Sequence, residues 1–184
     1  ILAEQVVADF DVPRQNLSAM DGFALGVGSD LSDQTAFEVI GESCAGSPCT
    51  GRILPNQAVR IFTGAVVPSD ADTVVMQENT DYQSIADFPY AVTLTQAATA
   101  GSNIRRQGEE ITKGEAVLDV GKRLNPADIS LLASLGVSIV LVCQPLIVGV
   151  LATGDELIAV GESLPSLANI YNSNTPTIKA LLAR

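Results

Sequence analysis

The chain contains no histidine and no tryptophan, and only 4% of its residues are aromatic. The lack of histidine excludes Ser-His-Asp and Cys-His catalysis, HExxH metalloproteases and histidine-ligated zinc within these 184 residues. Any acid–base chemistry must therefore fall to carboxylates, Lys, Cys, Tyr or a metal-bound water. The scarcity of aromatic residues also argues against a stacking platform for single-stranded nucleic acid.

Cysteine is scarce as well: the three residues are Cys44, Cys49 and Cys143, with no CxxC pair. A disulfide scaffold and a structural zinc site are therefore not expected, and the sequence favours a reducing, cytoplasmic location. The apolar stretch 137–152 is interrupted by polar residues and Pro145. It is shorter than the roughly 20 apolar residues of a membrane span, so we predict no membrane segment.

Basic residues are also few, since 10 Lys and Arg stand against 21 Asp and Glu and give a formal net charge of -11. Such a chain repels phosphate backbones on average, so we expect no nucleic-acid partner and no attraction to an anionic membrane surface. The hydrophobic content of 47% nevertheless fits a folded protein. The first residue is not Met and the last residues, IKALLAR, follow a helical pattern, which we interpret as a fragment of a longer protein.

Short runs of β-branched and apolar residues dominate residues 36–97. FEVIGES, AVRIFTG, TVVMQEN and YAVTLTQ are separated by Gly, Pro, Asn, Asp and Ser, which is typical of a small, mainly antiparallel β domain. Upstream, we expect a short strand within residues 1–10, and a tight turn at Asp21-Gly22 before a strand that starts at Phe23. Residues 101–124 predict a hairpin-like continuation.

A helix is predicted after Asn125, which is a suitable N-cap, with Pro126 at the first helical position and Gly136 as the stop signal. The spacing of apolar residues predicts a buried stripe made of Ile129, Leu132, Ala133 and Leu135.

The C-terminal part predicts the opening of an open α/β sheet. Residues 137–142 and 146–152 are predicted strands, and the second, LIVGVLA, has the pattern of a parallel strand buried on both faces. Thr153-Gly154-Asp155-Glu156 follows it, and Asn172 to Pro176 begins a helix that runs to the end. Ligands on such sheets bind outside the carboxyl ends of the strands.

Two polar clusters in the β region carry candidate chemistry. Asp21, in NLSAMDG, is either a turn residue or a carboxylate held rigidly for a cation or polar ligand. Thr63-Gly64 is either an ordinary turn or a source of a hydroxyl and free amides for an anion. Gln77-Glu78, at the end of the next strand, could join the same surface.

Two further clusters follow. Arg105 and Arg106 suit bidentate contacts to a tetrahedral oxyanion, or could pair with Glu109 and Glu110 on the surface. The TGDE turn is either a helix cap or a pair of carboxylates that coordinates Mg²⁺ beside phosphate.

NLSAMDGFAL, IFTGAVVP, VVMQEN, GSNIRRQGEEI, LLASLGV and VLATGDEL, in this order, resemble the molybdopterin molybdenumtransferase family of molybdenum-cofactor synthesis, whose fold the gephyrin E domain shares. The resemblance implies Mg²⁺-dependent insertion of molybdate into adenylylated molybdopterin, with release of AMP. It implies catalytic roles for Asp21, Thr63, Glu110 and Glu156, and metal binding by Asp155 and Glu156. It also implies substrate contacts from Ser18, Arg105, Arg106, Thr153, Gly154 and Asp155. The sequence departs from the family at Glu110, where Asp is usual, and at Phe23, where Tyr is common.

The resemblance further implies a mixed α/β, multi-domain fold. The expected parts are a discontinuous hinge domain (residues 1–9 and 107–144), a mainly antiparallel β domain (10–106) and the first βα unit of a molybdopterin-binding α/β domain (145–184). The expected partners are a second copy in a homodimer and a molybdopterin adenylyltransferase, and the chain alone is expected to be inactive. The alternative is a scaffold or interaction module of the gephyrin E domain type, without catalysis.

Overall fold

The computed structural model describes residues 1–83 and 87–183 and divides into two compact units, Ile1–Val142 and Cys143–Arg184. Most of its regular structure is strand, with two short α-helices and one 3-10 turn. Within the described residues, no helix has both the length and the apolar character needed to cross a bilayer.

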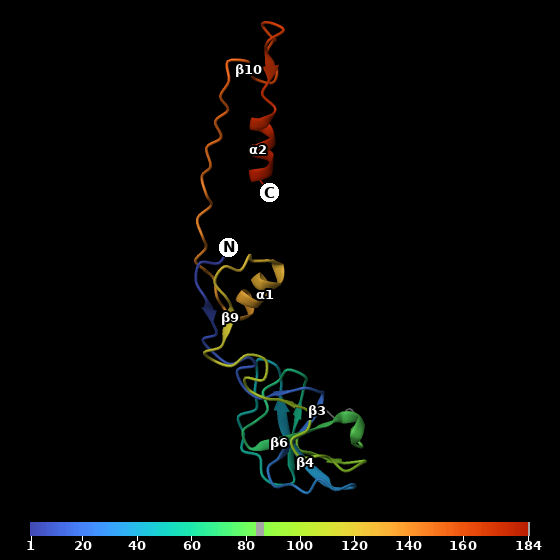
Figure 1. Ribbon diagram of the computed structural model, residues 1–184. Helices are drawn as coiled ribbons and strands as arrows, with labels where there is room; N and C mark the ends of the chain where they lie inside the picture. The colour runs from blue at the N-terminus through green and yellow to red at the C-terminus, as the bar shows by residue number, and fades with distance from the viewer. Residues whose placement is uncertain (84–86, 184) are drawn as a thin grey trace. The chain divides into compact units, whose positions relative to one another are not determined.

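A five-stranded sheet is the largest element of the first unit (Figure 1). Its strands lie in the order β6-β3-β5-β4-β7, and every neighbouring pair is antiparallel except β4 and β5. The expected strands of a mainly antiparallel domain are therefore present, in a mixed sheet. Their bounds are β3 Gly22–Gly26, β4 Ala36–Ser43, β5 Gln57–Ile61, β6 Ala71–Met76 and β7 Tyr90–Thr93.

The sheet is covered on both faces, because alternate residues of its inner strands enter two different apolar clusters. All five residues of β3 are buried. Phe23 and Leu25 enter one cluster with Phe37, whereas Ala24 enters the other with Val59. β3 and β5 are thus packed on both faces, and Asp21 and Thr63 lie just beyond their ends.

The predicted hairpin within residues 101–124 is wrong. β8 (Ile104–Arg105) pairs with β2 (Leu17–Ser18), and β9 (Ala116–Leu118) pairs with β1 (Val6–Val7). Both pairs are antiparallel, and each joins an early segment of the chain to a late one. The turn residues within 101–124 favour local pairing, but apolar contacts with β1 and β2 determine which strands pair.

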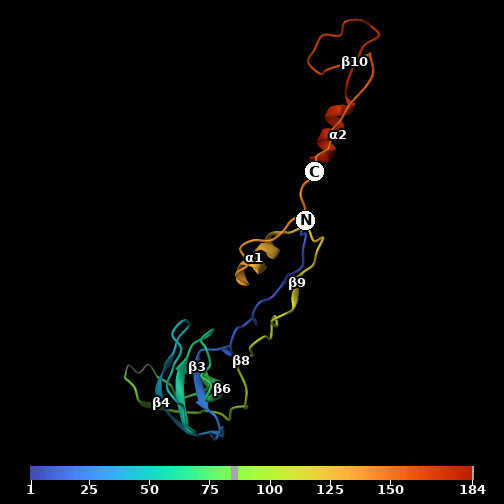
Figure 2. The same cartoon turned by 90° about the vertical axis from the view of Figure 1, so that its left-hand side faces the viewer.

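A small second core lies beside the β1–β9 pair. Leu2, Val6, Leu118 and Leu132 bury their side chains together, and Leu132 comes from α1 (Pro126–Ser134). Figure 2 shows β9 and α1 in this part of the chain.

Helix α1 starts as the sequence predicts. The Asn125 side chain accepts hydrogen bonds from the amides of Ala127 (2.8 Å) and Asp128 (3.2 Å), and the Asp128 carboxylate accepts one from the Asn125 amide (2.9 Å). This reciprocal arrangement is a capping box. The predicted buried stripe is wrong at Ile129 and Ala133, which are exposed. Asp128 takes an inward position instead, where Lys122 pairs with it at 2.6 Å.

Replacing Asn125 by Ala should lower the free energy of unfolding by about 1 kcal/mol, because two amides at the start of α1 lose their acceptor. Urea denaturation of the chain measures this change. Ser130→Ala, on the exposed middle of the same helix, is the control and should change it by less than about 0.5 kcal/mol. Equal stabilities of Asn125→Ala and the unaltered chain would contradict the capping role.

The predicted strands 137–142 and 146–152 do not form. Only Val142 makes an isolated bridge, to Leu2, and Leu146 and Ile147 are 90% and 96% exposed. LIVGVLA was predicted to be a parallel strand buried on both faces, and that prediction is wrong for the described residues. The structure contains no neighbouring parallel strand for it among the described residues, so the segment stays extended and unpaired.

The second unit contains a short parallel pair and a helix. β10 (Leu157–Ile158) pairs with β11 (Ile170–Tyr171), and α2 (Asn174–Leu182) confirms the predicted C-terminal helix. The Asn172 side chain accepts a hydrogen bond from the Thr175 amide (3.1 Å), as expected of the Asn172 to Pro176 segment.

Candidate functional site

Asp21 and Thr63, from two separate sequence clusters, are in direct contact. Asp21 immediately precedes β3 and Thr63 lies two residues after β5, and these antiparallel strands pair Gly22 with Ile61. One oxygen of Asp21, Oδ1, accepts hydrogen bonds from both the Thr63 amide and the Thr63 hydroxyl, each at 2.7 Å. Both residues are exposed. The sheet register therefore builds an accessible carboxylate–hydroxyl pair.

The Asp21 carboxyl is held in its ionised form. Hydrogen bonds from the Thr63 amide and then the Thr63 hydroxyl lower its pKa, and the positive charge of Arg60 adds to this effect. An ionised Asp21 can accept protons or bind a cationic or polar group, but it is not a proton donor at neutral pH. The hydrogen of the Thr63 hydroxyl points at Asp21, which leaves the oxygen lone pairs of Thr63 for a ligand.

Gln77 joins this surface, as its position after the next strand suggested. It opens the 3-10 turn η1 (Gln77–Asn79) directly after β6, and its amide donates to the Asp21 carbonyl at 3.1 Å. Its side-chain amide group donates to Glu78 at 3.2 Å. The ends of β3, β5 and β6 thus present Asp21, Thr63 and Gln77 together.

Sequence reasoning missed Arg60, which lies beneath these residues and is only 7% exposed. Its guanidinium donates to the Gly22 carbonyl (3.2 Å) and the Gln77 side-chain oxygen (2.6 Å). It also lies over three aromatic rings, with centroids at 5.1 Å (Phe23), 5.1 Å (Phe62) and 4.7 Å (Tyr82). A single arginine inside the apolar run AVRIF was the signal that could have found it.

Ser18 is fully buried and is occupied within the turn that precedes Asp21. Its hydroxyl donates to the Met20 carbonyl at 2.6 Å and accepts from the Met20 amide at 3.3 Å. Its backbone pairs with Ile104 of β8 and exchanges hydrogen bonds with the Gly64–Ala65 turn. The structure thus gives Ser18 a role in shaping the site, and its contact with substrate stays a prediction.

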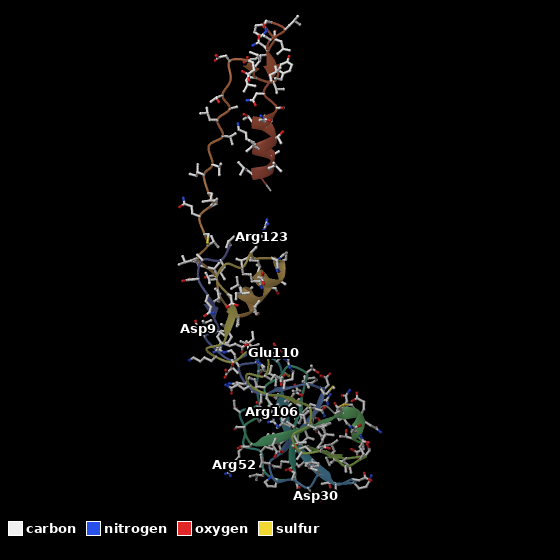
Figure 3. The ribbon with its side chains drawn as sticks, in the orientation of Figure 1. Asp9, Asp30, Arg52, Arg106, Glu110 and Arg123 are labelled. Atoms are coloured by element: carbon white, nitrogen blue, oxygen red, sulfur yellow. The ribbon has the colours of Figure 1, made fainter. Side chains whose placement is uncertain are left out.

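Arg105 is engaged by two glutamates. Its Nε lies 2.9 Å from Glu109 Oε1, and Nη2 forms an ion pair with Glu110. The pairing alternative for the Arg-Arg cluster is therefore present at Arg105, while the Arg106 side chain is exposed (Figure 3). Arg105 and Glu110 line a cavity of about 890 Å³ together with Arg14 and Leu17. Glu110 is thus held by a cation at the rim of a ligand-sized space.

Stability should fall as the pH is lowered from about 5 to 3. The folded pKa of Asp21 lies below its ordinary 3.8 because of Thr63, and that of Glu109 below its ordinary 4.5 because of Arg105 and the Arg106 amide. Folding therefore favours the ionised carboxylates, and their contribution is lost as the pH falls through the folded pKa values. Urea denaturation at pH 7, 5 and 3.5 measures the trend, and Glu109→Gln should show a shallower slope. A free energy of unfolding that rises toward pH 3.5 would contradict the argument.

The predicted TGDE site lies in an exposed turn before β10. The Gly154 carbonyl accepts from the Leu157 amide at 3.1 Å, and the Glu156 carboxylate folds back over Gly154, whose φ is +148°. A Cβ at Gly154 would lie 2.7 Å from Glu156 Oε1, the end of an exposed side chain that can move aside, so it is the φ of +148° that favours glycine here. The turn therefore supplies two neighbouring carboxylates, Asp155 and Glu156.

Residues 1–83 and 87–183 hold no group of three His, Cys, Asp or Glu side chains arranged for a metal. Asp155 and Glu156 do match the donor type of Mg²⁺, which is commonly bound by one or two carboxylates with water and substrate phosphate completing the shell. The donor set of this turn fits such a partial site.

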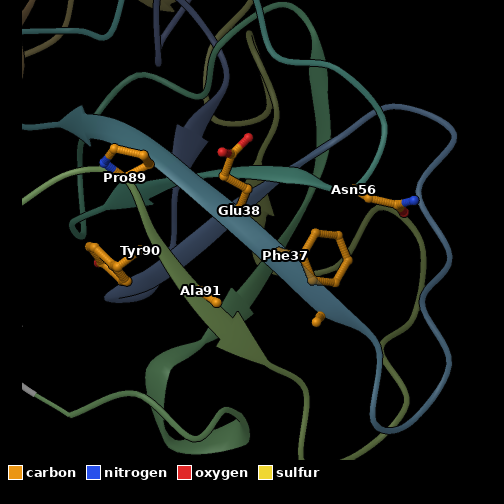
Figure 4. Close-up of a pocket in the computed structure, with 7 residues that line it drawn as sticks. Phe37, Glu38, Asn56, Pro89, Tyr90 and Ala91 are labelled. Atoms are coloured by element: carbon orange, nitrogen blue, oxygen red, sulfur yellow. The ribbon is translucent and has the colours of Figure 1, made fainter.

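A second cavity, of about 470 Å³, lies against the paired strands β4 and β7 at one edge of the sheet (Figure 4). Phe37 and Glu38 of β4 and Tyr90 and Ala91 of β7 line it, with Asn56 from the loop before β5. Its lining contains none of the predicted site residues, and its charged group is Glu38 alone. It offers no arrangement for chemistry.

Comparisons with known proteins agree on one family. Residues 1–136 match the MoeA N-terminal region (domain I and II). The chain is 41% identical to molybdopterin molybdenumtransferase of Haemophilus influenzae, over 100% of this chain and 44% of that protein. It is 44% identical to the protein of the same name from Staphylococcus epidermidis, over 98% of this chain and 43% of that protein.

Solved structures give the same result. The molybdopterin biosynthesis moeA protein from Pyrococcus horikoshii OT3 matches with a TM-score of 0.82 and 29% identity, over 100% of this chain and 48% of that one. The chain spans less than half the length of these relatives. The resemblance inferred from the motifs is confirmed, and the chain belongs to the MoeA N-terminal region family.

Proposed function

We propose that the chain is part of a molybdopterin molybdenumtransferase, which inserts molybdate into adenylylated molybdopterin with Mg²⁺ and releases AMP. One observation carries the proposal: the register of β3 and β5 joins Asp21 to Thr63 in an exposed carboxylate–hydroxyl pair. Curated relatives that bear this enzyme name cover the whole chain at about 40% identity. Because the chain spans under half their length, the proposal concerns the complete protein.

The residues of this chain take distinct roles in the proposal. Asp21 keeps the Thr63 hydroxyl oriented and supplies a fixed negative charge, while Thr63 offers its oxygen lone pairs to the reacting group. Glu110, held by Arg105, is the second fixed carboxylate of the first unit. The glutamate at this position reaches one methylene farther than the usual aspartate of the family.

The second unit would contribute the ligands of the metal ion. Asp155 and Glu156 would hold Mg²⁺, which neutralises phosphate charge when it is bound. Thr153 and Gly154 would contact the substrate from the same turn, in which Gly154 has a φ of +148°. Arg106, which is exposed, remains available for an anionic part of the substrate.

We further propose that the complete protein works as a homodimer in the cytoplasm and receives its substrate from a molybdopterin adenylyltransferase. The cytoplasmic location is supported by Cys44, Cys49 and Cys143, which are all free thiols.

The test is an assay of the complete protein with adenylylated molybdopterin, molybdate and Mg²⁺. The assay measures the AMP released and the molybdenum-loaded cofactor formed. We expect AMP release and molybdenum-loaded cofactor in equal amounts, both lost when Mg²⁺ is chelated. Release of neither product by a folded protein would overturn the proposal. AMP release without loading of molybdenum would mean that the protein only hydrolyses adenylylated molybdopterin, and the proposed transfer would be wrong.

A further inference from the structure

We propose that Arg60 is a positioning residue for the Asp21–Thr63 pair, holding the ends of β3 and β6 in the one arrangement that presents this pair to a ligand. The inference rests on the proposed function for its catalytic consequence, but its structural content stands apart from it. No motif of the sequence singled out Arg60, and none of the roles assigned above includes it.

The contacts of Arg60 reach the neighbouring strand β3 and the turn η1, which follows β6 on the far side of β3. Nη1 donates to the carbonyl of Gly22, the residue directly after Asp21. Nη2 donates to the side-chain oxygen of Gln77. The backbone amide of Gln77 in turn donates to the Asp21 carbonyl. Asp21 is therefore attached to Arg60 on both sides, through Gly22 and through Gln77. Thr63 follows three residues after Arg60 on the same chain segment.

The guanidinium is itself fixed in place. It is only 7% exposed and is surrounded by the rings of Phe23, Phe62 and Tyr82, each within about 5 Å of it. Phe23 and Tyr82 also contact each other edge to face at 5.4 Å. A planar cation packed against aromatic faces has few alternative positions, so its donor groups keep a constant direction.

Burial makes this arginine unusual. A buried cation needs compensation, which here comes from two oxygen acceptors and three aromatic faces. The carboxylates near it are Asp21, Glu78 beyond Gln77, and Glu42, which is opposite Arg60 in the β4–β5 ladder. An apolar residue would pack in this position without such compensation. The presence of an arginine at this buried position is explained if its hydrogen bonds shape the neighbouring Asp21–Thr63 pair.

Lysine cannot replace this function. Its ammonium supplies a point charge but no rigid pair of donors that reaches Gly22 and Gln77 together. Arg60→Lys therefore separates the charge of Arg60 from its geometry, and Arg60→Met removes both. Phe37→Leu is the matched control, because Phe37 is equally buried in the core beside Phe23 but makes no hydrogen bond to the site.

The test measures the pair itself in the 184-residue chain by NMR. Hydrogen exchange of the Thr63 amide reports its bond to Asp21, and the pH dependence of its chemical shift reports the Asp21 carboxyl. We expect exchange at least about tenfold faster in both Arg60→Met and Arg60→Lys. The Asp21 titration midpoint should rise in Arg60→Met and move less in Arg60→Lys. Phe37→Leu should change neither reading.

Unchanged Thr63 exchange in Arg60→Met would overturn the proposal and leave Arg60 as a packing residue. If Arg60→Met does not fold, Gln77→Ala is the second variant, because it removes one acceptor of Arg60. It should also speed Thr63 amide exchange and raise the Asp21 titration midpoint. No change of either reading in Gln77→Ala would equally overturn the proposal. In the complete protein, Arg60→Lys should lower kcat by about tenfold or more and leave KM within about threefold. If the unaltered complete protein inserts no molybdenum, the proposed function is wrong. The role of Arg60 is still decided by the NMR readings, which do not depend on activity.

Discussion

Asp21→Asn should lower the turnover of the complete protein by about 100- to 1,000-fold, with little change in its melting temperature. The asparagine side-chain oxygen can still accept the hydrogen bonds from the Thr63 amide and hydroxyl, so the turn keeps its shape. What the change removes is the fixed negative charge beside the Thr63 hydroxyl. The measurements are steady-state AMP release and thermal unfolding of the same preparation.

Asp30→Asn is a closely matched control. Asp30 Oδ1 accepts from the Ser32 amide (3.0 Å) and the Ser32 hydroxyl (2.7 Å), the same pattern that Asp21 makes with Thr63, and its pKa is lowered by those bonds. The two substitutions therefore differ in location and not in local chemistry. Asp30→Asn should leave turnover unchanged. Turnover within about threefold of normal in Asp21→Asn would remove Asp21 from the site.

The β domain was predictable because its strands carry their own signals. β4, β5, β6 and β7 lie on the four apolar, β-branched runs, and turn residues separate them in the sequence. The same signals do not specify which strands pair. The parallel pairing of β4 with β5, and the attachment of β8 and β9 to early segments, depend on apolar contacts between residues far apart in the chain.

The C-terminal error has a different cause. The run 146–152 has the composition of a buried parallel strand, but a strand exists only through the hydrogen bonds of its neighbours. With no such neighbour among the described residues, it is extended and exposed. The sequence pattern specifies the composition of a buried strand, but it does not supply the neighbouring strands on which such a strand depends.

The candidate site was predictable as residue types but not as a set of contacts. Asp21 and Thr63 were selected in separate motifs, and only the register of β3 with β5 joins them. Arg105 was selected for its charge, yet the structure pairs that charge with Glu109 and Glu110. Arg60 was missed because a single arginine in a strand carries no motif, and its importance comes from burial.

Gly22→Ala should destabilise the protein by about 3 kcal/mol and disturb the site at the same time. The sequence suggested that Gly22 serves a tight turn after Asp21. The structure instead makes it the first residue of β3, opposite Met76 of β6. A Cβ there would overlap the Val75 carbonyl oxygen and lie 2.8 Å from the Val75 carbonyl carbon. Backbone atoms cannot turn aside, so β3 and β6 would have to separate.

Gly41→Ala provides the comparison within the same sheet. Gly41 lies in β4, and the nearest atom to a Cβ added there is Cys49 Sγ at 3.9 Å, an ordinary contact distance. Its replacement should be neutral or stabilising by up to about 1 kcal/mol, because alanine restricts the unfolded chain. Urea denaturation of both variants tests this difference in sign. The amide of Thr63 should exchange faster only in Gly22→Ala, since separation of β3 from β6 displaces Asp21 as well. Equal stabilities of the two variants would mean that the approach of β6 to Gly22 does not constrain this end of the sheet.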